Sequence, residues 1–269
     1  MLTHPEASAM AAELGCGAIK SVVVRSLFPM MILSRLISRS PLMTRLCKST
    51  ARAGVWKRLR LSDSALPAVL SGLISGLPVT AIEVEDLVRE GKLSKSEGAK
   101  AVALASVPSP AFVILAASPT VTSGILRYLA LIILSYTVAS AFPSDKTMGT
   151  MPSPRISFTE AMSSSVTSAI SVSANMVFFT AVSCLLSSVL PQIKLASAVF
   201  FEMGSAISLS QGDPLVTSVI LGWCGLSALS QIRSVAPSVS VTPYAVTRLI
   251  SCALLAVLQF FAEFLQNAL

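Results

Sequence analysis

Long apolar stretches alternate with short polar turns along this chain, and several of the stretches are interrupted in the middle. Apolar blocks occupy residues 21–38, 124–142, 158–190 and 244–265. A helix rises about 1.5 Å per residue and the hydrocarbon core of a bilayer is about 30 Å thick, so a block approaching 20 residues indicates a membrane-crossing helix. The pattern therefore predicts an all-α polytopic membrane protein.

The stretch from Ala65 to Leu115 holds two apolar helices that are each broken near a proline. The first break is Ser75-Gly76-Leu77-Pro78 and the second is Val107-Pro108-Ser109-Pro110. A break at membrane depth leaves backbone groups unpaired, which hydrocarbon tolerates only where protein or a water-filled cavity covers them. Discontinuous helices in corresponding positions of two halves also mark transporter binding sites. We therefore predict a cavity where the breaks meet.

The segment between these breaks is too polar to cross a bilayer. Thr80 and Glu83 have the spacing of a capping box, so we expect a half-helix to restart at Thr80 with its positive end toward the break. Its continuation carries the charged residues Glu83, Glu85, Asp86, Arg89, Glu90 and Lys92. Residues 65–91 are accordingly predicted to form a re-entrant hairpin. Ser94 and Glu97 repeat the capping spacing and open the next helix.

The second half of the chain has a similar, weaker pair of interruptions. Residues 195–212 read as a short apolar hairpin that contains Glu202, and the helix over residues 216–232 is loosened by Gly222 and Gly225. The two halves have the same order of elements, although their identity is low. Each half crosses the membrane three times if a hairpin counts as no crossing, and an odd number of crossings inverts the second half. We predict an inverted repeat of spanning helices plus broken, re-entrant hairpins.

These elements form a single membrane domain over residues 1–269. Residues 1–20 are predicted to be an interfacial amphipathic segment, 21–142 the first repeat, 143–157 a linker and 158–269 the second repeat. No segment long enough for an independent soluble domain interrupts the apolar blocks.

Composition and charge agree with a membrane location. The chain is 53% hydrophobic and 12% charged, with a mean hydropathy of +0.76. Its net charge is +7, and half of its 20 Lys and Arg residues precede residue 61. Because basic residues are retained on the cytoplasmic side, residues 39–60 are predicted to be a cytoplasmic loop, not a nucleic-acid site. The expected partner is the lipid bilayer, with contact to anionic lipid or nucleic acid as the weaker alternative for this loop.

The inverted repeat and the charge bias are mutually consistent. With residues 39–60 inside, residues 89–100, the linker and the turn beside Arg233 are also inside. The basic residues expected near outer turns are Lys20, Arg127 and Lys194. The charge distribution therefore favours the inverted arrangement.

Two arginines lie within the first apolar block. Arg35 is near its end and is expected to snorkel to the surface. Arg25 either lies near the opposite surface or faces the cavity as an anion contact, and the sequence leaves both alternatives open.

Polar side chains in the second-half interruptions are candidate binding residues. An ionisable group inside an apolar hairpin is costly and marks a functional site by default, although Glu202 would serve almost as well by capping a half-helix. In a functional role, Glu202 would relay a proton or help to bind a coupling cation. Gln231 and Ser227 lie one helical turn apart and either present an amide and a hydroxyl to the same cavity or bond to a neighbouring helix.

The first-half breaks supply hydroxyls to the same predicted cavity. Ser75, Thr80, Ser106 and Ser109 stand at the breaks that Gly76 and Pro78 help to create. Hydroxyls and unpaired backbone N–H groups together hold carboxylates or phosphates, so the expected ligand is a small polar, anionic solute. The alternative is that the hydroxyls only satisfy the broken backbone.

Enzymatic activity is not expected. The only histidine, His4, lies outside the apolar region, so the membrane part cannot assemble a Ser-His pair or a His-based metal site. The sequence has no phosphate loop and no GxGxxG motif. Its five cysteines form no CxxC pair and read as packing thiols, so no cofactor or metal is expected.

Several segments together resemble a known family. They are SLFPMMILSRLIS, LSGLISGLPVTAIEVEDLVREGKLSKSEGAKAVALASVPSPAFVI, FFEMGSAISL, LGWCGLSALSQIRSV and PYAVTRLI. In this order they resemble the YlbJ-like sporulation integral membrane proteins, which belong to the wider nucleoside-recognition, or Gate-domain, membrane family. The resemblance covers nearly the whole chain from about Ser21. It implies an inverted-repeat membrane domain related to concentrative nucleoside transporters and, for YlbJ-like members, movement of the dianion dipicolinate across a bacterial forespore membrane.

The family's polar pattern is only partly kept in this chain. Glu202, Gly225, Ser227 and Gln231 match it, whereas Ser205 stands where an Asn is expected and Leu229 where a His is expected. The family's Asn-Asn-Ser-Gly-Pro is Ser106-Val107-Pro108-Ser109-Pro110 here. Two functions therefore stay open: a permease for a dipicolinate- or nucleoside-like solute, or a non-transporting membrane scaffold or recognition protein that keeps the fold without the site.

Overall fold

The protein is built from helices throughout the part of the chain that its computed structural model describes, residues 9, 13, 15–17, 19–51, 55–145 and 156–268. Within these residues, four helical segments are long and apolar enough to cross a membrane. They are α8 (Val121–Ala141), α9 (Phe158–Val189), the broken pair α12 (Pro214–Trp223) and α13 (Gly225–Val235), and α14 (Thr242–Ala268). The predicted all-α polytopic membrane fold is confirmed.

Large apolar side chains cover the outward faces of the long helices. Leu126 and Ile133 on α8, Ile170 and Phe178 on α9 and Phe260 on α14 are each more than half exposed. Exposed apolar surface on this scale is unusual for a protein surrounded by water, whereas it suits contact with lipid chains.

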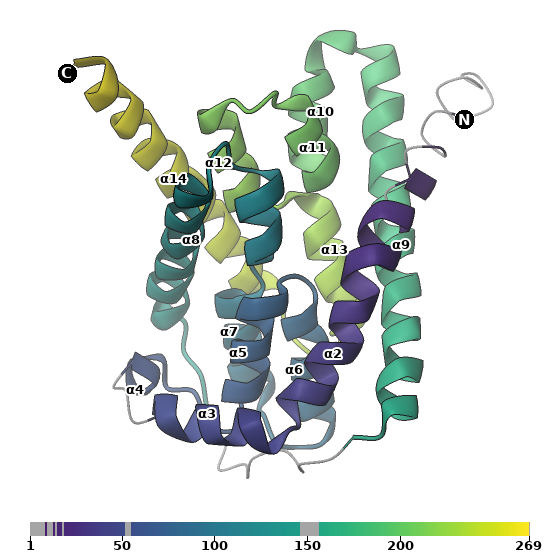
Figure 1. Cartoon of the computed structure of the whole chain (residues 1–269), viewed down its shortest axis with the longest axis vertical. Helices are drawn as coiled ribbons and strands as arrows, with labels where there is room; N and C mark the ends of the chain where they lie inside the picture. The colour runs from purple at the N-terminus through teal and green to yellow at the C-terminus, as the bar shows by residue number, and fades with distance from the viewer. Residues whose placement is uncertain are drawn as a thin grey trace.

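The first half crosses the molecule, forms a hairpin and then crosses twice more (Figure 1). The elements in order are η1 (Ile19–Leu27) continuing into α2 (Phe28–Ser38), the hairpin α5 (Leu66–Ser75) and α6 (Val79–Arg89), the broken crossing α7 (Lys95–Ala105) and η2 (Phe112–Ala116), and α8. The two hairpin helices pack against each other and against α7. Because the hairpin returns to its starting end, its charged helix α6 does not cross the membrane.

The second half repeats this order in the opposite sense. It consists of α9, the short η3 (Pro191–Ile193), the hairpin α10 (Lys194–Phe201) and α11 (Met203–Leu209), the broken crossing α12–α13, and α14. The α5–α6 hairpin lies at the lower end of the molecule in Figure 1 and the α10–α11 hairpin at the upper end. The predicted inversion of the second half is therefore confirmed.

The first-half helices break where the sequence placed the interruptions. Gly76 separates α5 from α6 with φ +79°, and residues 106–109 separate α7 from the following helical turn. Ser94 caps α7 as expected, accepting a hydrogen bond of 3.1 Å from the Glu97 backbone N–H. These local signals were sufficient because Gly and Pro act on the backbone itself.

One local prediction at the breaks was wrong. The helix α6 begins at Val79 with Pro78 as its N-cap and no side-chain cap, so Thr80 and Glu83 do not form a capping box. Proline is suited to a helix start because its missing N–H needs no partner there, and the Glu83 carboxylate is instead bonded by Ser34. In the second half, the helix is interrupted between Gly222 and Gly225 as predicted, and both Cys224 (φ +67°) and Gly225 (φ +81°) have a left-handed backbone conformation.

The basic region predicted as a loop over residues 39–60 instead contains two helices, α3 (Pro41–Ala51) and α4 (Val55–Leu59). The helix α3 lies across the lower end of the molecule in Figure 1. It buries Met43 and Cys47 against Leu66 of α5, whereas Arg45 and Lys48 are exposed. An amphipathic helix of this kind fits an interfacial position. The sequence did not indicate it, because the helical spacing of the apolar residues is masked by many basic residues.

Parts of the predicted domain organisation fall outside the described residues. Most of the interfacial segment 1–20 and of the linker 143–157 lies there, so both stay predictions. At the end of the linker, Ser157 caps α9 by accepting a hydrogen bond of 3.2 Å from the Glu160 N–H. The apolar block over residues 158–190 forms one continuous helix of 32 residues, α9.

The inverted arrangement predicts that Gly91, after α6, and Lys194, at the start of α10, face opposite sides of the membrane. Both residues are exposed. In a background without the native cysteines, Gly91→Cys and Lys194→Cys should react with an impermeant maleimide from opposite sides of sealed vesicles. As position controls, Asp145→Cys should behave like Gly91→Cys, and Gln211→Cys like Lys194→Cys. Labelling of both test positions from one side would contradict the repeat.

Candidate functional site

The tip of the first hairpin packs directly on the break in the crossing helix α7–η2. The Leu77 N–H donates a 3.0 Å hydrogen bond to the Val107 carbonyl. A Cβ atom added at Gly76 would lie 2.5 Å from the Ser109 backbone N, so only glycine allows this approach. Each break therefore satisfies part of the other's backbone, which is the condition for irregular chain inside a membrane.

The second half makes an equivalent contact with the roles of the two elements exchanged. Here the glycine is Gly225 at the α12–α13 break, where an added Cβ would lie 3.0 Å from the Phe201 carbonyl oxygen. The indole N–H of Trp223 donates a 3.1 Å hydrogen bond to the Phe200 carbonyl. The break in α12–α13 is thus held against the tip of the α10–α11 hairpin.

Glu202 forms the tip of this second hairpin and caps α11. Its carboxylate accepts hydrogen bonds from the backbone N–H groups of Gly204 at 3.0 Å and Ser205 at 2.7 Å. The Ser205 hydroxyl donates back to the Glu202 carbonyl at 3.2 Å. The capping role considered from the sequence is confirmed, and the residue is only 8% exposed.

A cavity of about 100 Å³ lies where the two halves meet. The first half contributes Leu27, Leu77, Pro108, Ser109 and Phe112, and the second half contributes Met176, Glu202, Met203, Gly204, Cys224, Ser227, Ala228 and Gln231. The polar groups in this lining come from three interruptions that are far apart in sequence: the α7 break, the α10–α11 tip and the start of α13. A predominantly apolar cavity with a few converging polar groups is the usual form of a small-molecule site.

The structure gathers only some of the predicted site residues around this cavity. Ser109, Glu202, Ser227 and Gln231 line it. Gly76, Gly225, Pro78 and Ser205 shape the breaks behind it, as described above. Three further candidates, Ser75, Thr80 and Ser106, are buried at the breaks away from the lining. Thr80 packs so closely on Gly72 that its Oγ1 would lie 1.7 Å from an added Cβ there, so Gly72 allows α5 and α6 to approach closely within the hairpin.

Gln231 and Ser227 use their helical spacing to bond to each other. The Gln231 side-chain N–H donates a 3.0 Å hydrogen bond to the Ser227 hydroxyl, and both residues line the cavity. Of the two alternatives left by the sequence, the shared cavity is therefore the arrangement observed.

Below the cavity, polar faces of α13 and α9 meet. On α13 the face continues through Ser230 and Ser234, and on α9 it runs through Ser171 and Asn175. Ser171 donates to the Ser234 hydroxyl at 2.9 Å, the Asn175 side-chain amide donates to the same hydroxyl at 3.3 Å, and Ser230 donates to the Asn175 Oδ1. Polar side chains of α9 therefore form hydrogen bonds to α13 as well as within their own helix.

This polar seam leads to an open cleft of about 360 Å³ between α6, α9 and α13. The cleft is lined by Arg35, Ile82, Glu85, Asp86, Arg89, Ser164, Thr167, Ser168, Ser171, Ser234, Val235 and Pro237. Ser171 and Ser234 belong both to the seam and to the cleft. A line of polar side chains therefore joins the end of the molecule that carries α3 and its basic residues to the central cavity.

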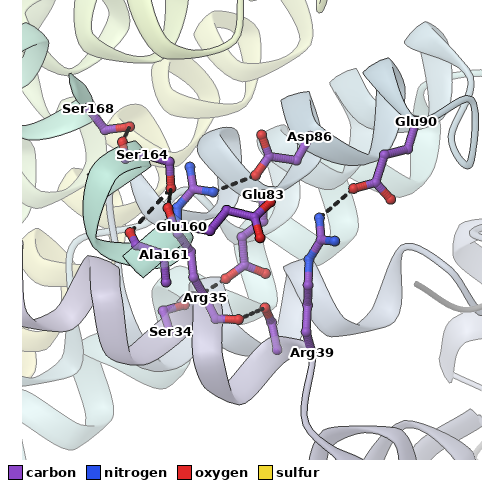
Figure 2. Close-up of polar contacts among 11 residues, drawn as sticks. Ser34, Arg35, Arg39, Glu83, Asp86, Glu90, Glu160, Ala161, Ser164 and Ser168 are labelled. Carbon is purple, nitrogen blue, oxygen red and sulfur yellow. Dashed lines mark hydrogen bonds and ion pairs between the residues drawn. The ribbon is translucent and has the colours of Figure 1, made fainter. Parts of the chain in front are cut away.

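A ladder of polar pairs joins α2 to α6 beside this cleft (Figure 2). Ser34 donates to Glu83 at 2.7 Å, Arg35 pairs with Asp86 at 2.6 Å, and Arg39 pairs with Glu90 at 2.6 Å. The expectation that Arg35 snorkels to the surface was wrong, because the residue is 7% exposed and finds its counter-ion on α6. Burial raises the pKa of the Glu83 carboxyl to about 7, although the hydroxyl of Ser34 and the charge of Arg35 act in the opposite direction.

Arg25, the other arginine of the first block, lies exposed on η1 and does not line the cavity. The surface alternative for this residue is therefore the one observed.

A separate and larger hollow of about 520 Å³ is lined by Lys95, Arg233 and other residues outside the four breaks.

Sequence reasoning overlooked Arg248. This residue of α14 has an exposed fraction of 0% and is the largest fully buried side chain in the described residues. The available signal was its position inside the last apolar block, because an arginine within a membrane span is a functional candidate by default.

Among the described residues, no group of three or more His, Cys, Asp or Glu side chains is placed to hold a metal ion. Comparisons of the chain with protein-family models, with curated proteins and with solved structures gave no match.

Proposed function

We propose that the protein is a membrane transporter or permease that binds a small polar, anionic solute in the cavity between its two halves. The observation that carries this proposal is the meeting of the α7 break, the α10–α11 tip and the α13 start around one cavity that a polar seam connects to an open cleft. Broken helices at the interface of inverted repeats supply unpaired backbone groups and helix ends for solute binding.

The size of the cavity suggests which motion transport requires. An engineered apolar cavity of about 150 Å³ holds benzene, whereas this cavity measures about 100 Å³. A nucleoside or a pyridine dicarboxylate therefore needs the hairpins to separate from the facing breaks before it fits. Such a movement of one repeat against the other is the usual basis of alternating access.

The resemblance to YlbJ-like and Gate-domain proteins supports a dipicolinate- or nucleoside-like solute and a bacterial cell membrane, with the forespore membrane as the specific location. Glu202 is the acidic residue on the cavity wall. We propose that it carries the proton or contacts the cation that is coupled to solute movement.

The proposal is tested by solute uptake into proteoliposomes with a panel of nucleosides and pyridine carboxylates. The reconstituted protein should take up at least one member above the level of protein-free vesicles, and Ser109→Ala should reduce that uptake. Ser188→Ala is the matched control, because Ser188 is exposed on α9 and bonds only within its own helix. Failure of the whole panel, or equal uptake by both variants, would count against a site at this cavity.

A non-transporting scaffold or recognition protein is the second candidate function. The observation that favours it is the burial of Thr80 and Ser106, whose hydroxyls have no hydrogen-bond partner and do not face the cavity. This function predicts a stable protein partner on purification together with the absence of any uptake or ligand-induced thermal shift.

A further inference from the structure

Arg248 is a buried charge without a counter-ion. Its guanidinium donates through Nη2 to the Ser135 hydroxyl of α8, while Nε and Nη1 are buried with no hydrogen-bond partner. Its other close neighbours are the ring of Tyr244, whose centroid lies 5.8 Å from the guanidinium carbon, and the thiol of Cys224. A buried guanidinium with unpaired N–H groups is strongly unfavourable unless something else compensates the charge.

The buried carboxylates of the described residues are all engaged elsewhere. Glu83 is bonded by Ser34, Glu85 by Arg89 and Ser238, Glu97 by the Ser62 N–H, and Glu202 by the Gly204 and Ser205 N–H groups. None of them forms an ion pair with Arg248. The compensating charge is therefore not supplied by an acidic side chain in this part of the chain.

Cys224 adjoins both Arg248 and the central cavity. The Cys224 thiol lies within electrostatic reach of both Arg248 and Tyr244, and Cys224 also lines the cavity. The positive charge of Arg248 consequently acts across one residue on whatever occupies the cavity. Coulomb interactions of this kind are strong where water is excluded.

The helix that starts beside Cys224 adds a second positive feature to the same wall. The 11-residue helix α13 begins at Gly225, and Cys224 provides no side-chain cap for its first N–H groups. Ser227 and Ala228 of its first turn line the cavity. By contrast, the N-terminus of α11 also lies at this cavity, but its first N–H groups already bond to the Glu202 carboxylate. Uncapped helix N-termini attract anions.

We propose that the cavity holds an anion at the start of α13 and that Arg248 is the residue that neutralises it from behind Cys224. The ligand class is a carboxylate or a similar small oxyanion. This inference rests on the proposed function and deepens it by assigning the solute's charge to the α13 wall. Glu202 and the bound anion would then each occupy a helix N-terminus at the same cavity.

Equilibrium binding tests this site without requiring transport. Trp223 adjoins Cys224, so in a Trp56→Phe background its fluorescence reports on the break. Benzoate, which enters when the hairpins separate as the larger solutes do, should change this fluorescence saturably, whereas its uncharged analogue benzamide should not. Arg248→Gln should weaken benzoate binding at least about tenfold. Arg127→Gln removes an equal charge from α8, where Arg127 bonds the Ala117 carbonyl, and should bind benzoate as the unsubstituted protein does.

A second measurement needs no substitution at Arg248. Iodoacetate and iodoacetamide differ in charge but react with thiols in the same way, and Cys16 is an exposed internal reference in the same sample. The ratio of iodoacetate to iodoacetamide labelling, measured by peptide mass spectrometry, should be at least about tenfold higher at Cys224 than at Cys16. Equal ratios, absence of reaction at Cys224, or benzoate binding that survives in Arg248→Gln would each overturn the proposal.

The same experiments separate this inference from the proposed function. Benzoate binding without uptake of any solute would retain the anion site and reject transport. Uptake of neutral nucleosides without carboxylate binding would retain transport and reject the anion site.

Discussion

Replacing Glu202 with glutamine should reduce solute uptake by about 10- to 100-fold, because a hydrogen-bonded charge is worth about 1.5–3 kcal/mol and each 1.4 kcal/mol is tenfold. The substitution removes the ionisable group of the cavity wall while keeping one oxygen that can accept from Gly204 or Ser205. The loss of capping strength should lower the free energy of unfolding by only about 1 kcal/mol. Uptake in proteoliposomes, normalised to folded protein, measures the first effect, and thermal unfolding in detergent measures the second.

Asp213→Asn is the matched control for this substitution. Asp213 also caps a helix with its carboxylate, accepting from the Val216 N–H at 2.8 Å, but it is exposed and does not line the cavity. It should show a similar small loss of stability with unchanged uptake. If Glu202→Gln also left uptake unchanged, Glu202 would be a capping residue without a role in transport.

Replacing Gly76 with alanine should lower the free energy of unfolding by about 3 kcal/mol. Gly76 has φ +79° and ψ −166°, a region of backbone conformation that is essentially restricted to glycine and costs other residues about 1–3 kcal/mol. The added Cβ would also lie 2.5 Å from the Ser109 backbone N, where neither chain has room to move without breaking the contact between tip and break. Thermal unfolding in detergent should show a large fall in the transition midpoint.

Gly91→Ala separates the conformational cost from the packing cost. Gly91 also has a positive φ, +68°, but an added Cβ there would meet nothing within 4 Å. Its substitution should therefore cost only about 1 kcal/mol. Equal destabilisation by the two variants would show that the hairpin tip does not press on the α7 break.

The overall architecture followed from local signals in the sequence. Apolar blocks of the required length marked the continuous crossings, and Gly76, Pro78, Pro108 and Pro110 marked the first-half interruptions, because each acts directly on its own stretch of backbone. The inversion of the second half then followed from counting crossings. Cys224 shows the limit of this reasoning, because a cysteine does not indicate a left-handed backbone conformation in the way that a glycine does.

The candidate site was only partly predictable. Ser109, Glu202, Ser227 and Gln231 were identified as polar residues at or near interruptions, and they do line one cavity. Ser75, Thr80 and Ser106 were chosen by the same criterion and face elsewhere. The criterion locates a residue along the chain but does not determine the direction of its side chain, which depends on how the hairpin rotates against α7.

The sequence by itself determined that this protein is helical, apolar and divided into two similar halves with interrupted helices, because these properties depend on residue type and spacing within single segments. Only the tertiary structure decided which polar groups meet. The pairing of Arg35 with Asp86, the polar seam between α9 and α13 and the burial of Arg248 without a counter-ion each join residues from separate helices. Such contacts depend on the packing angles and register of whole helices, which no short segment of sequence specifies.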